Sequence, residues 1–151
     1  MRALPVRLII ISGRSGSGKS TALHQLEDEG FYCIDNLPVS LLLALMEKTG
    51  GDEFQFFQGT AVCIDARNAW KDLENFQSIL DSLPSSVDTQ VLFLDAQEIT
   101  LLQRFGETRR RHPLSTDSIP LAEAIDSERE LLEPISSCAS LVLDTSQMTV
   151  Y

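Results

Sequence analysis

A glycine-rich segment near the amino end constrains the fold of this chain more than any other feature. The segment GRSGSGKST, residues 13–21, directly follows the apolar run VRLIII at residues 6–11. Residues 13–20 fit the P-loop pattern, which is Gly, four residues of any kind and Gly-Lys-Ser/Thr, without a mismatch. Such a loop joins a strand to a helix, so it predicts a strand over 6–12 and a helix over 19–29.

The residue types in this loop suit the binding of a phosphate chain. Glycines allow a close approach that a Cβ would block, and successive N–H groups at the amino end of a helix attract an anion. We expect Lys19 to lie along the β- and γ-phosphates of a nucleoside triphosphate and the Ser20 hydroxyl to bind Mg²⁺. The alternative is a glycine-rich turn with an exposed lysine. The expected cofactor is Mg²⁺ with ATP or GTP, and the expected contacts are Gly13, Arg14, Ser15, Gly16, Ser17, Gly18, Lys19, Ser20 and Thr21.

Apolar segments of strand length alternate with helical periodicity along the rest of the chain. Further strands are expected over residues 31–35, 60–65, 89–95 and 141–144, and further helices over 98–108 and 121–135. Asn36 is the expected cap of a helix with Pro38 in its first turn, and Asn68 that of another. This alternation predicts an α/β P-loop NTPase fold: a five-stranded, mainly parallel sheet with helices on both faces, similar to that of small kinases.

The composition narrows the class of protein. The chain has 151 residues, of which 43% are hydrophobic, and this suits a single globular domain over 1–151. Its longest apolar run, residues 41–46, is far too short to span a bilayer, so no membrane partner is expected. The three cysteines form no Cys-x-x-Cys pair and the amino end carries no secretion signal, so we expect a cytoplasmic protein. A net charge of −10 opposes binding of a nucleic-acid backbone by the domain as a whole.

The end of the sequence bears on domain organisation. The chain stops soon after the fifth expected strand, with no helix left to follow it. We therefore expect residues 1–151 to be the amino-terminal domain of a longer protein.

Three aspartates are candidates to hold the metal through water. Asp35, Asp65 and Asp95 each close an expected strand. In the sheet common to P-loop kinases the third strand lies beside the first, which favours Asp65 and leaves Asp35 as the second candidate. Asp95 is the third, and at least one of the three must be a solvated aspartate at a strand end.

Four of the twelve lysines and arginines fall within eight residues, at Arg104, Arg109, Arg110 and Arg111. If the helix over 98–108 continues, Arg104 and Arg111 are seven residues apart on one face. Such a cluster resembles the Arg-rich lid of small P-loop kinases, in which guanidinium groups neutralise the charge of the transferred phosphoryl group. The candidate catalytic residues are therefore Lys19, Asp65, Arg104 and Arg111. The alternative for the arginines is a solvated basic face that balances nearby acids.

Four ordered motifs together resemble a known family. They are the P-loop, FYCIDNLP at residues 31–38, DARN at 65–68 and ETRRRHPL at 107–114. With these motifs the chain resembles the amino-terminal domain of the RapZ family, bacterial P-loop nucleotide-binding proteins that serve as RNase adapters. The resemblance covers essentially the whole chain.

The resemblance implies a function that the spacing of residues alone does not. Family members bind ATP and GTP and hydrolyse them weakly. The segment Gly13–Ser20 would correspond to the family's ATP-contacting loop, and Asp65, Ala66, Arg67 and Asn68 to its guanine-nucleotide segment. In the full-length protein, a carboxyl-terminal domain with a basic tail makes the main contact with small regulatory RNA, which the protein presents to an endoribonuclease. This sequence has no such tail, in agreement with its acidic composition.

The sequence is therefore consistent with two functions. The first is a regulatory ATP- or GTP-binding domain of an RNase adapter, with weak ATPase or GTPase activity at most. The alternative is a small-molecule kinase that transfers the γ-phosphoryl group of ATP to a metabolite. Both ATP and GTP, and both a monomer and a homo-oligomer, are consistent with the sequence.

Overall fold

Five parallel strands form one sheet in the part of the chain that the structure describes. The computed structural model describes residues 6–14, 17–49, 57–65, 73–84, 86–108, 114 and 121–146. The strand order is β2-β3-β1-β4-β5, and every neighbouring pair runs parallel. The strands are β1 (Val6–Gly13), β2 (Tyr32–Ile34), β3 (Thr60–Cys63), β4 (Val87–Asp95) and β5 (Leu141–Asp144). The predicted α/β P-loop fold is confirmed, as is the prediction that the third strand lies beside the first.

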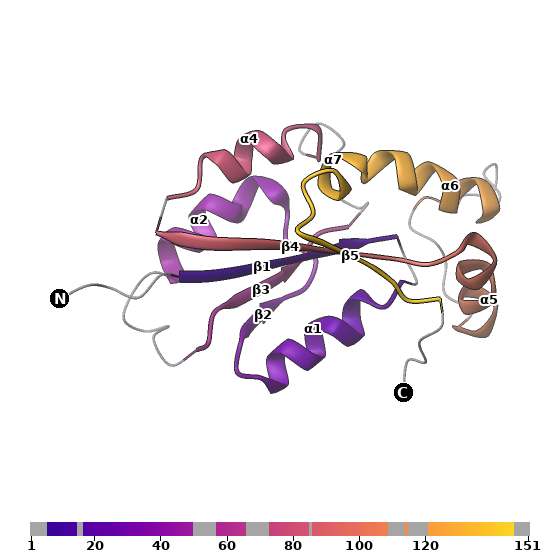
Figure 1. Cartoon of the computed structure of the whole chain (residues 1–151), viewed down its shortest axis with the longest axis horizontal. Coiled ribbons are helices and arrows are strands. Elements are labelled where there is room, and N and C mark those ends of the chain that lie inside the picture. The colour runs from indigo at the N-terminus through magenta and orange to yellow at the C-terminus, as the bar shows by residue number, and fades with distance from the viewer. Residues whose placement is uncertain are drawn as a thin grey trace.

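Helices cover both faces of this sheet (Figure 1). One face is covered by α1 (Lys19–Asp28). The other is covered by α2 (Leu42–Thr49), α4 (Phe76–Asp81) and α7 (Glu133–Ser136). Beyond the carboxyl end of β4, α5 (Glu98–Thr108) packs against α6 (Leu121–Leu131). None of the described helices combines the length and apolar character needed to cross a membrane.

The central strand β1 is buried on both faces, which explains its continuous apolar run. Leu8 and Ile10 pack in a core with Leu42 and Phe76, on the side of α2 and α4. Ile11 faces the opposite side and packs with Leu23 of α1. A strand with helices above and below buries consecutive residues, so it loses the alternation seen in strands with one wet face.

Two expected helix boundaries were wrong. Asn36 does not cap a helix: it has a φ of 56° and lies in a bend, and Pro38 takes the cap position before a 3₁₀ turn, η1 (Val39–Leu41). The helix expected over 121–135 ends at Leu131, and α7 follows as a separate turn. Pro134 explains this break, because proline has no N–H to donate and its ring opposes a continuous helix.

Candidate functional site

The glycine-rich loop lies at the carboxyl end of the sheet, between β1 and α1. Gly13 is the last residue of β1 and has a φ of 150°, and a Cβ at this position would collide with the backbone carbonyl of Leu94. Gly18 caps α1 with a φ of 106°, and among the described residues, its chain neighbours aside, no atom lies within 4 Å of the position its Cβ would take. The loop therefore packs closely against β4 at Gly13, whereas Gly18 has room for a side chain among the described residues. Ser15 and Gly16 lie outside the described residues.

The amino end of α1 carries a positive electrostatic potential that no side chain of the helix neutralises. Its Gly18 cap supplies no side-chain hydrogen bond, and its first turn holds no acidic residue. The N–H groups of this turn and the helix dipole are therefore not neutralised by the helix's own side chains. Ser20 and Thr21 stand exposed on this turn. This arrangement suits an incoming anion.

Lys19 lies folded over the loop. Its Nζ donates hydrogen bonds to the carbonyl oxygens of Gly13 at 2.9 Å and Arg14 at 3.1 Å. The ammonium group thus lies between β1 and α1, within the loop where the sequence predicts phosphate binding. The side chain of Ser17 is fully buried nearby, and its Oγ is, among the described side chains, a buried polar atom with no hydrogen-bond partner.

Asp65 lies two residues after the end of β3, the strand beside β1, and is only 5% exposed. The segment before it is fixed to β1, because Ile64 N–H donates to the Ile11 carbonyl at 2.9 Å and Ser12 Oγ to the Ile64 carbonyl at 2.6 Å. Asp35, the second candidate, is exposed after β2. Ala66, Arg67 and Asn68, the rest of the expected nucleotide segment, lie outside the described residues.

The charged residues at the carboxyl end of the sheet shift the pKa of the Cys63 thiol. Burial, and after it the carboxylate of Asp35, raise the pKa of Cys63 to about 12. The Lys19 ammonium acts in the opposite direction and lowers this pKa, while Asp65 raises it. Both candidate carboxylates and the P-loop lysine therefore act on one buried atom at the end of β3. The structure therefore brings Lys19 and Asp65, which lie 46 residues apart in the sequence, close enough to act on the same thiol.

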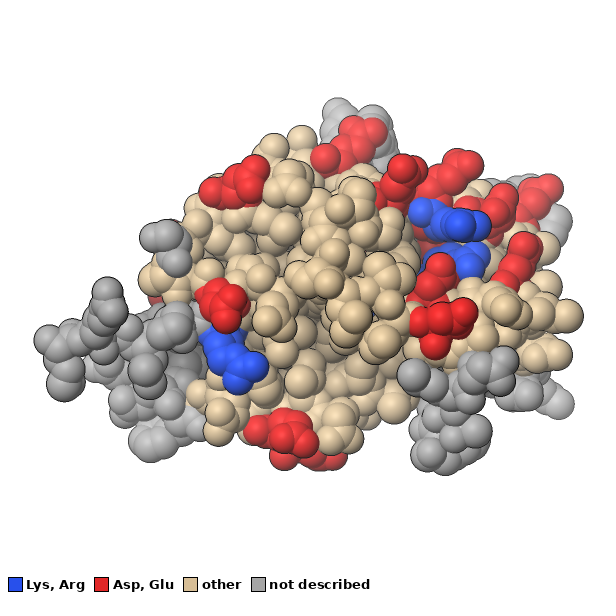
Figure 2. All heavy atoms as spheres, viewed as in Figure 1, with Lys and Arg blue, Asp and Glu red and all other residues tan. Residues whose placement is uncertain are grey.

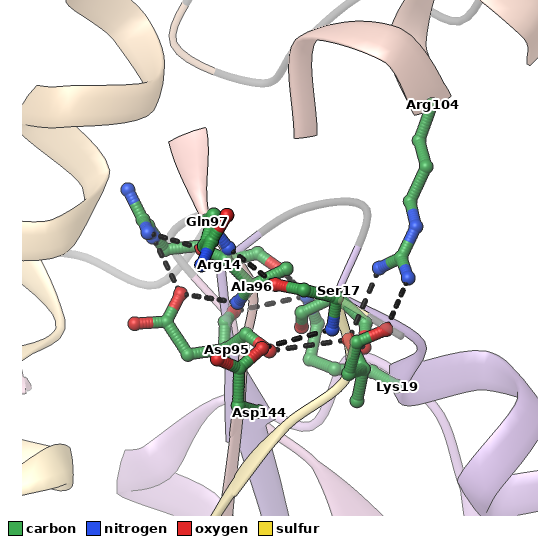
Figure 3. A network of polar contacts seen from close by, with 11 residues as sticks. Arg14, Ser17, Lys19, Asp95, Ala96, Gln97, Arg104 and Asp144 are labelled. Atoms are coloured by element: carbon green, nitrogen blue, oxygen red, sulfur yellow. Dashed lines mark hydrogen bonds and ion pairs between the residues drawn. The ribbon is translucent and has the colours of Figure 1, made fainter. Parts of the chain in front are cut away.

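Asp95, the third candidate, is engaged by the loop itself (Figure 3). Arg14 Nε donates to Asp95 Oδ1 at 2.7 Å, and an Arg14 Nη donates to the Ala96 carbonyl at 2.7 Å. The Ala96 N–H also donates to Asp95 Oδ1, at 2.8 Å. The carboxylate therefore holds the P-loop arginine against the end of β4.

Arg104 extends from α5 to the residue that follows β5. Its Nη1 donates to the Thr145 hydroxyl at 3.0 Å, and its Nη2 donates to the Thr145 carbonyl. The Thr145 hydroxyl in turn donates to the Ser17 carbonyl of the P-loop at 2.7 Å. The predicted catalytic role of Arg104 stays a prediction, and Arg109, Arg110 and Arg111 lie outside the described residues.

Sequence reasoning missed Thr145, to which it gave no role. It named Arg14 as an expected nucleotide contact but missed its bond to Asp95. The available signal was position: Thr145 follows LVLD, so the parallel sheet places its hydroxyl at the same edge as the P-loop. The residue before Thr145 is Asp144. Hydrogen bonds from Ser146 lower the pKa of Asp144, and the positive charge of Arg104 lowers it as well.

The P-loop between β1 and α1, with β3 beside β1 in a five-stranded parallel sheet, defines a P-loop NTPase-fold domain of the kinase-like type. The family model described as the RapZ-like N-terminal domain matches residues 6–151. The chain belongs to this family, and the resemblance stated from its four motifs is confirmed.

Relatives and solved structures agree with this assignment. A "Nucleotide-binding protein" of Hahella chejuensis is 52% identical over 97% of this chain and 51% of its own length. An "RNase adapter protein RapZ" of Photorhabdus laumondii is 51% identical over 95% of this chain and 50% of its own. The chain therefore spans about half the length of the curated relatives it matches.

The fold is shared with small kinases. A sugar kinase from Janibacter superposes with a TM-score of 0.58 at 18% identity, covering 97% of this chain and 88% of its own. A shikimate kinase from Acinetobacter baumannii superposes with a TM-score of 0.56 at 15% identity, covering 98% and 87%. At such identities the likeness concerns the fold alone.

Proposed function

We propose that this domain binds a nucleoside triphosphate, ATP or GTP, with Mg²⁺ at the glycine-rich loop. The observation that carries the proposal is the amino end of α1, where neither a capping side chain nor an acidic residue satisfies the first turn. The buried, unpaired Ser17 hydroxyl and the ammonium of Lys19 lie in the same loop. Each of these features favours an anion bound beside the loop.

The residues of the site fit a hard cation as well as a phosphate chain. Ser20 and Asp65 offer oxygen atoms alone, the ligand type that Mg²⁺ prefers. In this proposal Ser20 binds the metal directly and Asp65 holds it through water, with Asp35 as the second candidate. Bound Mg²⁺ would neutralise phosphate charge and orient the triphosphate. Lys19 would lie along the β- and γ-phosphates.

The remaining predicted residues complete the proposed site. Asp65, Ala66, Arg67 and Asn68 would contact the nucleotide, and Arg111 would neutralise charge on the γ-phosphate. Any hydrolysis is proposed to be slow, so the main role would be regulatory.

For the whole protein we propose a role as an RNase adapter that controls the processing of small regulatory RNA in the cytoplasm. The support is the name of the Photorhabdus relative, together with the family of this domain. RNA and an endoribonuclease would be bound through the full-length chain. Figure 2 shows acidic side chains spread over the pictured face and basic ones in small areas that border them, which disfavours RNA contact there.

The second candidate is a small-molecule kinase. It is favoured by the fold, which is shared with sugar and shikimate kinases. A kinase would transfer the γ-phosphoryl group rapidly to an acceptor, whereas the regulatory domain would show slow hydrolysis at most. Incubating the protein with Mg·ATP and a metabolite pool, and searching for phosphorylated products, separates the two.

The test of the main proposal is a titration of the protein with ATP and GTP, each with and without Mg²⁺. Removing the Lys19 ammonium in Lys19→Ala deletes a charge-assisted contact, so about 10-fold or greater loss of affinity is expected. Lys48→Ala, at an exposed lysine in the last turn of α2, is the matched control and should bind as the native chain does. Absence of binding at millimolar Mg·ATP and Mg·GTP, or equal affinity in Lys19→Ala, would contradict the proposal.

A further inference from the structure

The Thr145 side chain connects three elements that meet at the P-loop. Its hydroxyl donates to the Ser17 carbonyl at 2.7 Å, across 128 residues of sequence. Its backbone N–H donates to the Asp95 carbonyl at 2.7 Å, which fixes the residue to the end of β4. The residue is only 6% exposed, so these bonds are shielded from water. Thr145 therefore holds one peptide group of the P-loop from outside the loop.

The peptide group held in this way joins Ser17 to Gly18. This bond is trans, so its C=O and N–H point in opposite directions. Because the Ser17 carbonyl points at Thr145, the Gly18 N–H must point away from it. Within the described residues this N–H has no hydrogen-bond partner, and a Cβ at Gly18 would meet no atom of another residue within 4 Å. Among the described residues, the cap of α1 thus carries an N–H without an acceptor, directed away from Thr145.

Arg104 restricts the direction of the Thr145 hydroxyl. A threonine hydroxyl has one hydrogen to donate, and two carbonyls lie within reach, Ser17 at 2.7 Å and Asp95 at 3.1 Å. Arg104 Nη1 donates to the same oxygen at 3.0 Å and so occupies a lone pair. The hydroxyl hydrogen therefore points away from the guanidinium, and the shorter of the two carbonyl contacts is the one to Ser17. A donor that itself accepts from a guanidinium is also the stronger donor.

We propose that Thr145 is a positioning residue for phosphate binding. It orients the Ser17–Gly18 peptide so that the Gly18 N–H is presented to a phosphate oxygen, and Arg104 orients Thr145. The inference rests on the proposed nucleotide-binding function and assigns a role there to a residue outside the P-loop pattern.

The experiment uses Thr145→Val, which removes the hydroxyl at constant shape. Valine keeps the backbone bonds to Asp95 and to Arg104, because both use main-chain atoms of residue 145. Affinity is measured for Mg·ATP and for inorganic tripolyphosphate, which has the phosphate chain without a base. Thr145→Ser restores the hydroxyl, and Ser146→Ala removes the neighbouring hydroxyl, which accepts from the Gln97 N–H rather than contacting the loop.

Thr145→Val should bind both probes about 3- to 10-fold more weakly, the effect of one lost hydrogen bond. Thr145→Ser and Ser146→Ala should stay within about twofold of the native affinity. Arg104→Gln should weaken binding in the native background and add little to Thr145→Val, because an effect that acts through Thr145 is lost with it.

Other outcomes overturn the inference or the proposed function separately. Equal affinity in Thr145→Val, or a loss for Mg·ATP without one for tripolyphosphate, refutes phosphate positioning. If Thr145→Val and the smaller Thr145→Ala both fail to fold, Thr145 is a structural residue and the inference is wrong. If the native protein binds neither probe, the proposed function itself fails, whatever the variants do.

Discussion

Arg14 Nε and Asp95 Oδ1 lie 2.7 Å apart, although 81 residues separate the two side chains in sequence. The pair joins the second residue of the P-loop to the last residue of β4. The arginine side chain is 6% exposed and the aspartate side chain 28%. Together with the Arg14 bond to the Ala96 carbonyl, the pair fixes the start of the loop to the sheet.

Arg14→Ala should lower the free energy of unfolding by about 2–3 kcal/mol. Removing one partner of a buried ion pair costs about 3–5 kcal/mol, and the partial exposure of Asp95 reduces this figure. Urea denaturation gives the value, and Arg129→Ala, at an exposed arginine of α6, should change stability by no more than about 0.5 kcal/mol. If Arg14→Ala costs no more than Arg129→Ala, the pair does not stabilise the loop.

The two glycines of the loop that the structure describes should differ in their tolerance of a methyl group. Gly13→Ala forces a Cβ into the Leu94 carbonyl and should cost about 3 kcal/mol or more, or prevent folding. Gly18→Ala meets no atom of the other described residues within 4 Å, so its expected cost is the backbone strain at a φ of 106°, about 1–2 kcal/mol. Thermal melts of both variants test this order, and a more stable Gly13→Ala would contradict the close approach to β4.

The sequence predicted the local elements well where hydrophobic pattern and turn chemistry agreed. The helix over 98–108 and the strand over 141–144 have the predicted bounds, because each is set by its own residues. Pro134 was the visible reason to end α6 early, but the apolar spacing of Ile125 and Leu132 suggested a continuous helix. Both residues are buried, Ile125 where α5 packs against α6 and Leu132 in the main core. Their spacing therefore indicated which residues are buried, but not that one continuous helix joins them.

The candidate site was predictable only in part, because its outer contacts are not local. The P-loop pattern gave Gly13, Gly18 and Lys19, whose roles follow from adjacent residues. The partners Asp95 and Thr145 lie 81 and 128 residues from their contacts in the loop. No spacing rule connects such residues, and only the strand order brings them to one edge.

Asp65→Asn should reduce the contribution of Mg²⁺ to ATP affinity. The carboxylate lies 5% exposed at the end of β3, next to the P-loop strand, and a carboxylate that holds a metal through water is typically worth about 10- to 100-fold in metal affinity. The measurement is the ratio of ATP affinities with Mg²⁺ and with EDTA. Asp35→Asn, at the exposed second candidate, should leave the ratio unchanged. The reverse result would assign the metal to Asp35.

The Cys63 thiol should make the protein less stable in alkali. In the unfolded chain this thiol ionises near its ordinary pKa of 9.0, whereas burial and the nearby Asp35 raise its pKa to about 12 in the fold. Above pH 9 the folded state therefore binds more protons than the unfolded state, so stability falls as pH rises toward 12. Below pH 9 the thiol is protonated in both states and contributes no pH dependence.

Between pH 8 and pH 10 this group alone should remove about 1.4 kcal/mol from the free energy of unfolding. Urea denaturation of the native chain and of Cys63→Ala at both pH values isolates it, because other groups contribute equally to the two proteins. The alanine variant starts less stable, since it leaves a small cavity, but its loss on going to pH 10 should be smaller by that amount. Equal losses would mean that Cys63 ionises freely in the folded protein. The end of β3 would then be open to water, in contradiction to the structure, in which Cys63 is 1% exposed.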